Sequence, residues 1–481
     1  MKKKLLLAMI FLVVLLTPLM FIVDSESEAG DRYRRIEIDN SGNAETLTDY
    51  QIFLNVSYDS DMQSDFDDLR FTWYDESSSQ EVSIDYWLDK YVDSEYALVW
   101  VEVPSISGLG QETLYMYYGD PDATSESNGE ETFVFFDGFS TDSTANYQLW
   151  SPRRKFENPN ELSWDPNGWL FVNASIREEP GRNSNVHVYH KTAVMDPSEG
   201  QYWLETRCKA FGDGWLDYLG VCNLYKLDST PQDLYFRTAK VEQGIRDVYP
   251  MNKSSVSVGW GGWECYINND LPTSVIDQWF RIGLGTALDG TVIGSFHDDN
   301  YGVLDTLVCQ TTHQDTKWWV DMIISRILTD DWATMHAYFD YVRVRKFTVP
   351  EPLYSIGPEE PIPATVNIDP DTLNLKSNGE WITAYIELSE DYSVSNIDPN
   401  SILLNGIVSV DAEGPVSVGD YDLDDIPDLM VKFERTAIIE WLDTNDYGED
   451  TGKYYEINLT ITGTVSGTQF AGTDQVKVLK R

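Results

Sequence analysis

Basic residues are scarce in this chain of 481 residues. Lysine and arginine together number 34 against 80 aspartates and glutamates, which gives a formal net charge of −46. Such a charge repels nucleic acids and anionic lipid surfaces, and it favours cations and solubility. Aromatic residues are plentiful at 13%, whereas disordered acidic chains are poor in them. The composition therefore predicts a folded acidic protein that does not bind nucleic acid.

Helical patterns are also scarce, since we find no run with helical periodicity longer than two turns. Short runs that alternate apolar and polar residues are separated by turn residues instead, as in 50–57, 96–103 and 455–462. Such a pattern is typical of antiparallel β-sandwiches. Because 481 residues exceed one ordinary domain, we expect about three domains. The predicted fold class is all-β and multidomain.

Only one long apolar run is present, from Leu5 to Val23, directly after Lys2-Lys3-Lys4. This order predicts that residues 1–30 are a secretory signal. The run is also close to the roughly 20 residues that span a bilayer, so an uncleaved N-terminal anchor stays open. Both interpretations predict an extracellular or cell-surface protein that contacts a membrane only through this segment, if it is retained.

Cysteine is rare, and all four cysteines fall in the middle of the chain: Cys208, Cys222, Cys265 and Cys309. An even number in an exported domain predicts two disulfides, with three possible pairings. Zinc binding is a weaker interpretation, because there is no C-x-x-C pair and only His313 stands close to a cysteine. Isolated buried thiols are the remaining alternative.

The middle of the chain is bounded by a seam, Thr132–Ser140, and by a closing run, Ala337–Arg345. Phe133, Phe135 and Phe139 are apolar at strand spacing within the seam. We predict that the seam is the first strand of a large β-sandwich and that the closing run is its last strand. The expected domains are 31–130, 131–349 and 364–481, with a proline-rich linker at 350–363.

Several spaced motifs mark the first domain, including Arg34–Asn40, Asp68–Phe71, Trp100–Ser105 and Met116–Ala123. With these motifs, residues 31–130 resemble an uncharacterised domain of secreted bacterial and archaeal proteins, expected here to be a β-sandwich. That family is often followed by a concanavalin-A-like lectin/glucanase domain. The resemblance implies a role in surface polysaccharide or in adhesion, and it does not imply a mechanism.

The second domain, 131–349, resembles the concanavalin-A-like jelly roll in its seam, in a hairpin signal at Phe211–Trp215 and in the closing Asp340–Val344. Glycosidases of this architecture resemble one another in a Glu-x-Asp-x-Glu strand, where alternation places the carboxylates on one face. No such triplet lies between Asp137 and Arg345, and Glu205 and Glu264 each stand alone. A Gly-x-Ser-x-Gly nucleophile motif is also absent. The sequence therefore predicts sugar binding without catalysis.

Tryptophans at turns are the candidate sugar-stacking residues, because sugar rings present apolar faces to an indole. Trp260 and Trp263 flank two glycines and are the first choice, followed by Trp215 on a Gly-Asp-Gly turn and then by Trp318-Trp319. A place in the core is the alternative for each of them. His187 and His190 are three residues apart, hence on opposite faces of a strand, and are expected to be surface or half-buried residues rather than ligands.

The third domain, 364–481, resembles an Ig-like C-terminal module of secreted prokaryotic proteins in Asp371–Gly379 and Ala384–Leu388. It contains the sharpest chemical motif of the chain. Four carboxylates stand at positions one, three, five and nine of a loop: Asp420, Asp422, Asp424 and Asp428. Ca²⁺ binds several hard oxygens in such loops. Asp425 occupies the usual glycine position, and Val431 stands where an EF-hand has glutamate, so a short calcium loop is expected rather than an EF-hand. A solvated acidic turn is the alternative.

These features together predict a secreted or cell-surface, non-catalytic carbohydrate-binding or adhesion protein. Its expected partners are polysaccharides or glycoprotein glycans, and its expected cofactor is Ca²⁺. A divergent extracellular glycoside hydrolase and a passive cell-surface structural protein remain as alternatives.

Overall fold

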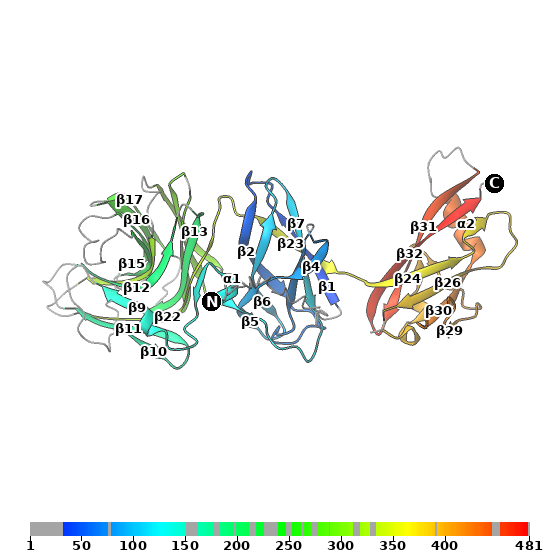
Figure 1. Cartoon of the computed structure of the whole chain (residues 1–481), viewed down its shortest axis with the longest axis horizontal. Coiled ribbons are helices and arrows are strands. Elements are labelled where there is room, and N and C mark those ends of the chain that lie inside the picture. Colours follow the sequence, from blue (N-terminus) through cyan, green and yellow to red (C-terminus); the bar gives the residue numbers. More distant parts are fainter. Residues whose placement is uncertain are drawn as a thin grey trace, which may run out of the picture.

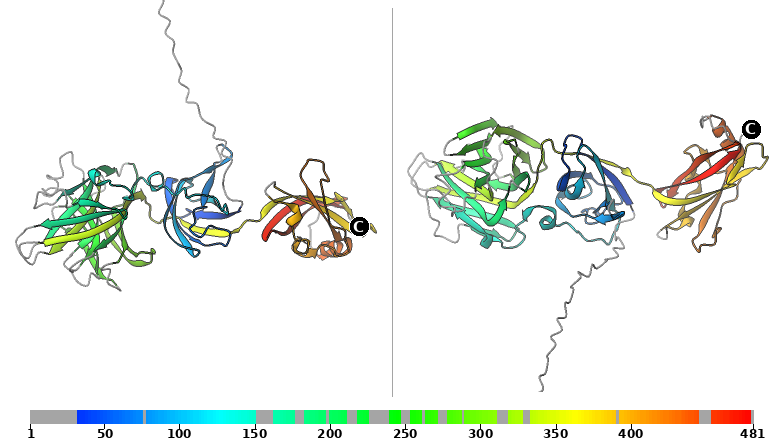
Figure 2. Two further views of the ribbon diagram at one scale, coloured as in Figure 1. Left: turned by 90° about the horizontal axis from the view of Figure 1, so that it is seen from below. Right: turned by 45° about the horizontal axis from the view of Figure 1, so that its top comes forward.

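The computed structural model describes most of the chain from Arg32 to Leu479. The described ranges are 32–75, 78–150, 162–176, 183–196, 199–210, 218–225, 239–246, 253–260, 263–271, 278–287, 289–310, 318–327, 333–389, 392–444 and 453–479. Three bodies lie in a row, and the N-terminal domain occupies the middle position (Figure 1, Figure 2). Strands dominate all three bodies, which confirms the all-β multidomain prediction. Within the described residues, no helix is long and apolar enough for a membrane span.

The N-terminal domain is a sandwich of two antiparallel sheets, with strand orders β23-β1-β7-β3-β4 and β2-β6-β5. Alternation along the strands supplies its core, as in β1, where Ile36 and Ile38 are fully buried between more exposed neighbours. Its elements are β1 (Arg32–Asp39), β2 (Leu47–Ser57), β3 (Arg70–Asp75), β4 (Gln80–Ser83), β5 (Tyr86–Val92), β6 (Tyr96–Ile106), β7 (Gln111–Tyr118), α1 (Gly129–Thr132) and β23 (Leu353–Glu359).

Strand β23 corrects the predicted linker at 350–363. It pairs antiparallel with β1 as the edge of the N-terminal sheet, where a proline such as Pro358 is tolerated. Tyr354 and Ile356 pack against the N-terminal core, and the Tyr118 hydroxyl donates to Glu359 over 2.8 Å. The chain therefore returns to the N-terminal domain after the middle domain, which is an insertion into it. Only two residues, 360 and 361, separate β23 from the C-terminal domain.

The inserted middle domain is a large two-sheet β-sandwich. One sheet has the order β10-β11-β22-β13-β18-β19-β20, with β8 also paired to β22, and the other has the order β17-β16-β15-β14-β21-β12-β9. Its strands are β8 (Phe135–Asp137), β9 (Tyr147–Trp150), β10 (Leu162–Asp165), β11 (Trp169–Ile176), β12 (Asn183–Met195), β13 (Tyr202–Ala210), β14 (Tyr218–Tyr225), β15 (Ala239–Arg246), β16 (Lys253–Trp260), β17 (Trp263–Asp270), β18 (Phe280–Thr286), β19 (Thr291–Asp298), β20 (Val303–Gln310), β21 (Trp318–Ile327) and β22 (Ala333–Lys346).

The seam and the closing run lie side by side, because Phe135 on β8 pairs with Val344 on β22. Both segments therefore form strands of the predicted sandwich, and the structure places them in the same sheet. The seam strand is shorter than predicted, since Thr132 ends α1 and only three residues form β8. Phe139 enters the core of the middle domain and Phe135 packs against it. Phe133 instead turns toward the N-terminal domain, where its ring contacts Trp87 and Trp100.

The C-terminal domain is a smaller β-sandwich with the strand order β28-β27-β31-β32-β24-β26-β30-β29, and β25 also pairs with β32. Its elements are β24 (Ile362–Asp369), β25 (Thr372–Asn374), β26 (Trp381–Leu388), β27 (Leu403–Leu404), β28 (Val408–Ser409), β29 (Ser417–Gly419), β30 (Asp428–Glu434), α2 (Arg435–Thr444), β31 (Tyr454–Val465) and β32 (Thr468–Leu479). The ten-residue helix α2 contradicts the expectation that no helical run exceeds two turns. It forms because Ile438 and Leu442, four residues apart, both enter the core.

Candidate functional site

The outer face of the β13–β22 sheet carries buried charges toward the N-terminal domain. Val342 and Val344 on β22 point into the core of the middle domain, so alternation turns Arg343 the other way. Glu205 on β13 is the direct cross-strand neighbour of Arg343. Both side chains are almost completely buried, at 4% exposure for Glu205 and 0% for Arg343. A buried ion pair therefore lies between the two domains.

Hydrogen bonds complete the surroundings of Glu205. Its carboxylate accepts from Arg343 Nη2 over 2.5 Å, from the Tyr341 hydroxyl over 2.9 Å and from Trp203 Nε1 over 3.3 Å. Burial raises the pKa of Glu205, but the charge of Arg343, followed by His297 and Arg281, outweighs it and leaves the pKa below its usual value. Glu205 is therefore held as a carboxylate. The sequence showed it only as an isolated acid on a strand.

Aromatic rings from both domains surround Arg343. Its guanidinium carbon lies 4.3 Å from the centroid of Trp100 and 5.3 Å from that of Trp87, both on N-terminal strands. Phe133 of the seam lies 4.9 Å away. Cation–π contacts of this kind contribute about 0.5–2 kcal/mol each. A second buried ion pair crosses the same boundary, since Arg281 Nη2 lies 3.1 Å from Asp89 Oδ1. The two domains thus share one polar and aromatic interior.

A pocket of 430 Å³ opens beside this cluster, between the two domains. Its size lies within the range of small-molecule sites. Glu205 and Trp203 lie at its inner end, and the half-exposed Val349 and the exposed Glu351 lie at its mouth. Five aromatic side chains line it, two from the N-terminal domain and three from the middle domain or its exit: Phe53, Trp100, Trp203, Tyr301 and Phe347.

Two glycines explain how Trp203 lies flat along the pocket floor. A Cβ atom at Gly283 would lie 2.3 Å from the indole nitrogen of Trp203, and one at Gly285 would lie 2.5 Å from its ring. Contacts this short do not occur between real atoms, so β18 needs glycine at both positions to leave room for the indole. Local sequence thus prepares a flat aromatic surface.

Polar groups lie among these rings. The Arg345 guanidinium makes two hydrogen bonds to the Glu351 carboxylate, of 2.7 and 3.1 Å. Half-buried His297 has its Nδ1 3.2 Å from the Tyr301 carbonyl oxygen, and burial lowers the pKa of its imidazole, which favours the neutral ring at pH 7. The pocket therefore offers hydrogen-bonding groups with fixed positions between aromatic surfaces.

The tryptophans predicted for sugar stacking are not among the described residues that line this pocket. Trp260 ends β16 and Trp263 begins β17, and these two strands pair antiparallel. The structure does not describe the side chains of Trp260 and Trp263, and Trp215 lies outside the described residues. Trp319 is buried on β21 and packs on Tyr189 with 5.3 Å between ring centroids. Trp319 is therefore not an exposed stacking surface, although the core cluster of the domain includes its neighbours Val320 and Met322 and not Trp319 itself.

His187 corrects one expectation. It is neither a surface nor a half-buried residue, because only 1% of it is exposed. Its Nδ1 lies 2.6 Å from Oδ2 of Asp321, which is also buried. The carboxylate on the neighbouring strand β21 allows the imidazole to be buried. His190, by contrast, is half-buried as predicted.

The cysteines differ from the predicted pattern of two disulfides. Cys208 is a free thiol in the core of the middle domain, and burial raises its pKa well above the usual value. Four cysteines with one free thiol allow at most one disulfide within the chain, so the prediction of two is wrong. Cys309 is disulfide-bonded, whereas the side chains of Cys222 and Cys265 are not among those described. Strand alternation on β13 places Cys208 in the core of the middle domain. The sequence alone did not reveal this position.

The acidic loop between β29 and β30 brings its carboxylates together. Oxygen atoms of Asp420, Asp422 and Asp428 lie within 4.8 Å of one another, and so do those of Asp422, Asp424 and Glu387. Glu387 lies on β26, the neighbour of β30, and was not predicted. Asp420 accepts the backbone N–H groups of residues 423, 424 and 425, which fixes the loop. Desolvation and the adjacent charge of Asp424 raise the pKa of Asp422.

Comparisons with known proteins found one family model and several solved structures. A domain of unknown function, DUF2341, matches residues 65–153, which supports the resemblance noted for the N-terminal domain. No curated protein sequence matches the chain. Similar solved structures include a Bacillus licheniformis β-glucanase, at 12% identity and a TM-score of 0.32, covering 44% of this chain and 98% of that chain. A Lotus tetragonolobus seed lectin is similar at 8% identity and a TM-score of 0.30, covering 47% of this chain and 99% of that chain.

Proposed function

We propose that this protein is a secreted or cell-surface carbohydrate-binding protein without catalytic activity. The observation that carries the proposal is the pocket between the N-terminal and middle domains, where five aromatic side chains surround hydrogen-bonding groups. Sugar rings combine apolar faces with hydroxyl groups, and this pocket has partners for both. The basic start and apolar run of residues 1–30 support export.

The charges in the pocket favour a neutral ligand. Arg345 is paired with Glu351 and Arg343 with Glu205, so the two cations and two anions compensate each other locally. A sulfated or carboxylated sugar would also approach a chain with a net charge of −46. Aromatic contacts contribute about 0.5–1.5 kcal/mol each beyond area burial. We therefore expect weak binding of neutral sugars at each site, which several copies on a surface would strengthen.

Both carboxylates that line the pocket are unsuited to glycoside hydrolysis. That reaction needs one carboxylic acid with a raised pKa to protonate the leaving oxygen. The pKa of Glu205 is lowered, and Glu351 is held by two hydrogen bonds from Arg345. Glu205 is thus not prepared to donate a proton, and Glu351 is engaged in an ion pair with Arg345. This supports the binding function over the hydrolase alternative.

A glycan array probed with the whole protein, followed by titration of each neutral sugar that is retained, tests the proposal. Phe53→Ala removes a half-buried ring from the mouth of the pocket and is expected to weaken binding about five- to tenfold, from the loss of one aromatic contact. Tyr74→Ala removes an exposed ring of the same domain away from the pocket and serves as the control. Equal binding by both variants contradicts the site. Release of reducing ends by the wild-type protein overturns the non-catalytic function.

We also propose that one Ca²⁺ binds the acidic loop of the C-terminal domain. Hard oxygen ligands come from Asp420, Asp422 and Asp424 in the loop, from Asp428 at the start of β30 and from Glu387 on the neighbouring strand β26. The backbone at Leu423 and Asp425 is left-handed, with φ of 68° and 76°, and aspartate tolerates this conformation better than most residues. Ca²⁺ would offset the repulsion among these carboxylates and stabilise the domain.

Isothermal titration of the whole chain with CaCl₂ tests the ion site. The wild-type protein is expected to bind one Ca²⁺, and Asp422→Ala combined with Asp424→Ala is expected to abolish this binding. Glu413→Gln combined with Glu456→Gln changes the charge of the same domain by the same amount at exposed positions and controls for counter-ion effects. Heats that are the same for the loop variant and the wild type contradict the site.

A further inference from the structure

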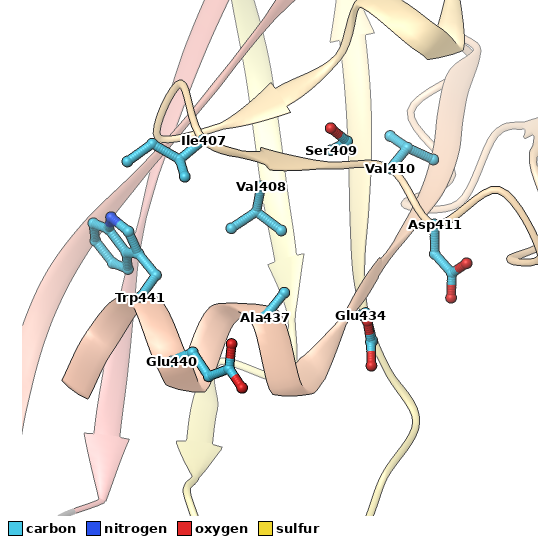
Figure 3. A pocket seen from close by; sticks show the side chains of 9 residues that line it. All are labelled: Ile407, Val408, Ser409, Val410, Asp411, Glu434, Ala437, Glu440 and Trp441. Atoms are coloured by element: carbon cyan, nitrogen blue, oxygen red, sulfur yellow. The ribbon is translucent and has the colours of Figure 1, made fainter. Parts of the chain in front are cut away.

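The C-terminal domain contains a groove of 680 Å³ between the β27–β28 hairpin and helix α2 (Figure 3). The carbohydrate site and the calcium loop do not involve it. Ser409 and Val410 run above the helix on one side, and Ala437 and Trp441 on the helix face them from the other (Figure 3). The backbone N–H of Asp411 donates to the Lys432 carbonyl over 2.8 Å, which ties the end of the hairpin to β30.

The floor of the groove is apolar because of the period of α2. Ile438 and Leu442 enter the core of the domain, which leaves Ala437 and Trp441, also four residues apart, on the side of the groove. Ile407 at the hairpin turn is 67% exposed although it is large and apolar. The apolar strip of the groove consists of Ile407, Val408, Ala437 and Trp441. Such a strip suits an aliphatic side chain or the methylene chain of a lysine or arginine.

Carboxylates border this strip on the hairpin side and on the helix side (Figure 3). Asp411, Glu434 and Glu440 lie along it (Figure 3), and none of the described residues that line the groove is cationic. Asp411 is fixed, since it accepts from Trp381 Nε1 over 2.7 Å and from the backbone of Glu413 over 3.0 Å. Glu434 and Glu440 are exposed. This charge is complementary to a cation, and an indole adds a surface on which a cation can lie.

The hairpin adds a backbone edge to the groove. Strand β28 is at the end of its sheet and, within the described residues, pairs only with β27. Terminal strands have unpaired backbone groups on their outer side and can accept a further extended segment. An extended polypeptide alternates its side chains, so it can direct apolar and basic residues to different parts of the groove.

We propose that this groove binds an extended segment of a partner protein, with a lysine or arginine against Glu434 and Glu440 and an apolar side chain against Trp441 and Ile407. The partner segment is basic and amphipathic. Acidic segments are excluded by the carboxylates along the groove, and a second copy of this acidic chain is disfavoured by its own charge.

An acetylated and amidated hexapeptide of alternating leucine and lysine is the probe, titrated into the whole protein at 0.15 M NaCl by fluorescence anisotropy. Glu434→Gln combined with Glu440→Gln is expected to weaken its binding about tenfold, because it removes two exposed partners of the lysine side chains of the peptide. Ala437→Phe fills the groove and is expected to abolish binding, and Ala437→Leu provides a smaller filling if the phenylalanine variant unfolds. Circular dichroism checks the fold of each variant.

Four results overturn the proposal. The control variant, Glu413→Gln with Glu456→Gln, changes two residues outside the groove. If it loses as much affinity as Glu434→Gln with Glu440→Gln, the peptide binds the acidic surface in general. Full binding to folded groove-filling variants shows that the groove is not the site. If spermidine binds as tightly as the hexapeptide, the occupant is a small polyamine. If the protein forms a dimer that Ala437→Phe abolishes, the occupant is a second copy of this chain. The carbohydrate site is unaffected by all of these variants, so the two proposals fail independently.

Discussion

Replacing Arg343 by methionine is expected to destabilise the N-terminal and middle domains strongly. Arg343 is fully buried, and its loss leaves Glu205 as a carboxylate with 4% exposure and without its ion-pair partner. Breaking a buried pair in this way costs about 3–5 kcal/mol. The hydroxyl of Tyr341 still donates to Glu205, so we expect the lower half of this range. For domains of this size, such a change lowers Tm by roughly 6–15 °C.

The assay is differential scanning calorimetry of the whole chain, together with Glu205→Leu and the double variant. Replacing a buried pair by apolar side chains of similar volume is often nearly neutral, so Arg343→Met with Glu205→Leu is expected to recover most of the loss. The transition of the C-terminal domain provides an internal reference. Lys477→Met breaks an exposed pair of 3.8 Å with Glu456 and is expected to cost less than about 1 kcal/mol.

Two outcomes would refute this reasoning. A single Arg343→Met change that costs under about 1 kcal/mol would show that Glu205 escapes its buried position or takes up a proton easily. A double variant as unstable as the sum of the two single variants would show that the two side chains act independently. Because Trp87 and Trp100 belong to the N-terminal domain, both domains are expected to lose stability in one transition.

Three further outcomes are expected. Partial burial, with Asp49 and Asp85 nearby, raises the pKa of Glu102 from 4.5 to about 7. The protonated side chain therefore adds to the free energy of unfolding, fully below pH 4.5, and this contribution is lost as the pH rises through 7. We expect a loss of about 1–2 kcal/mol, because Glu102 is half-exposed and solvent screens its charge. In urea unfolding, Glu102→Gln should be more stable than the wild type at pH 8 and equally stable at pH 5. The control Glu95→Gln changes an exposed residue and should have the same stability relative to the wild type at both pH values. Mass spectrometry should find one disulfide that includes Cys309, with Cys208 alkylated only after unfolding; two disulfides in the native protein would contradict this. A chain that ends at Val349 lacks β23 and its Glu359 contacts with Arg32 and Tyr118, so it should melt below a chain that ends at Glu360; equal melting temperatures would show that β23 is dispensable.

Local patterns in the sequence predicted the strands well, since alternation along one strand depends on neighbouring residues only. The seam and the closing run were predicted to be strands of one β-sandwich, and the structure pairs them directly, Phe135 with Val344. The acidic loop was also visible, because Asp420 to Asp428 are close along the chain. In each case the signal lies within a few residues.

The tertiary structure alone decided which distant residues meet. The segment around Pro358 reads locally as a linker, and it becomes a strand because β1 has a free edge for it. Glu205 is an ordinary acid in its own strand, and its role arises from Arg343, Tyr341 and rings of the N-terminal domain that lie more than 60 residues away. The pocket exists only because the middle domain is inserted into the N-terminal one and is pressed against it. Sequence alternation determines which face a side chain takes, whereas the packing of whole sheets determines what that face meets.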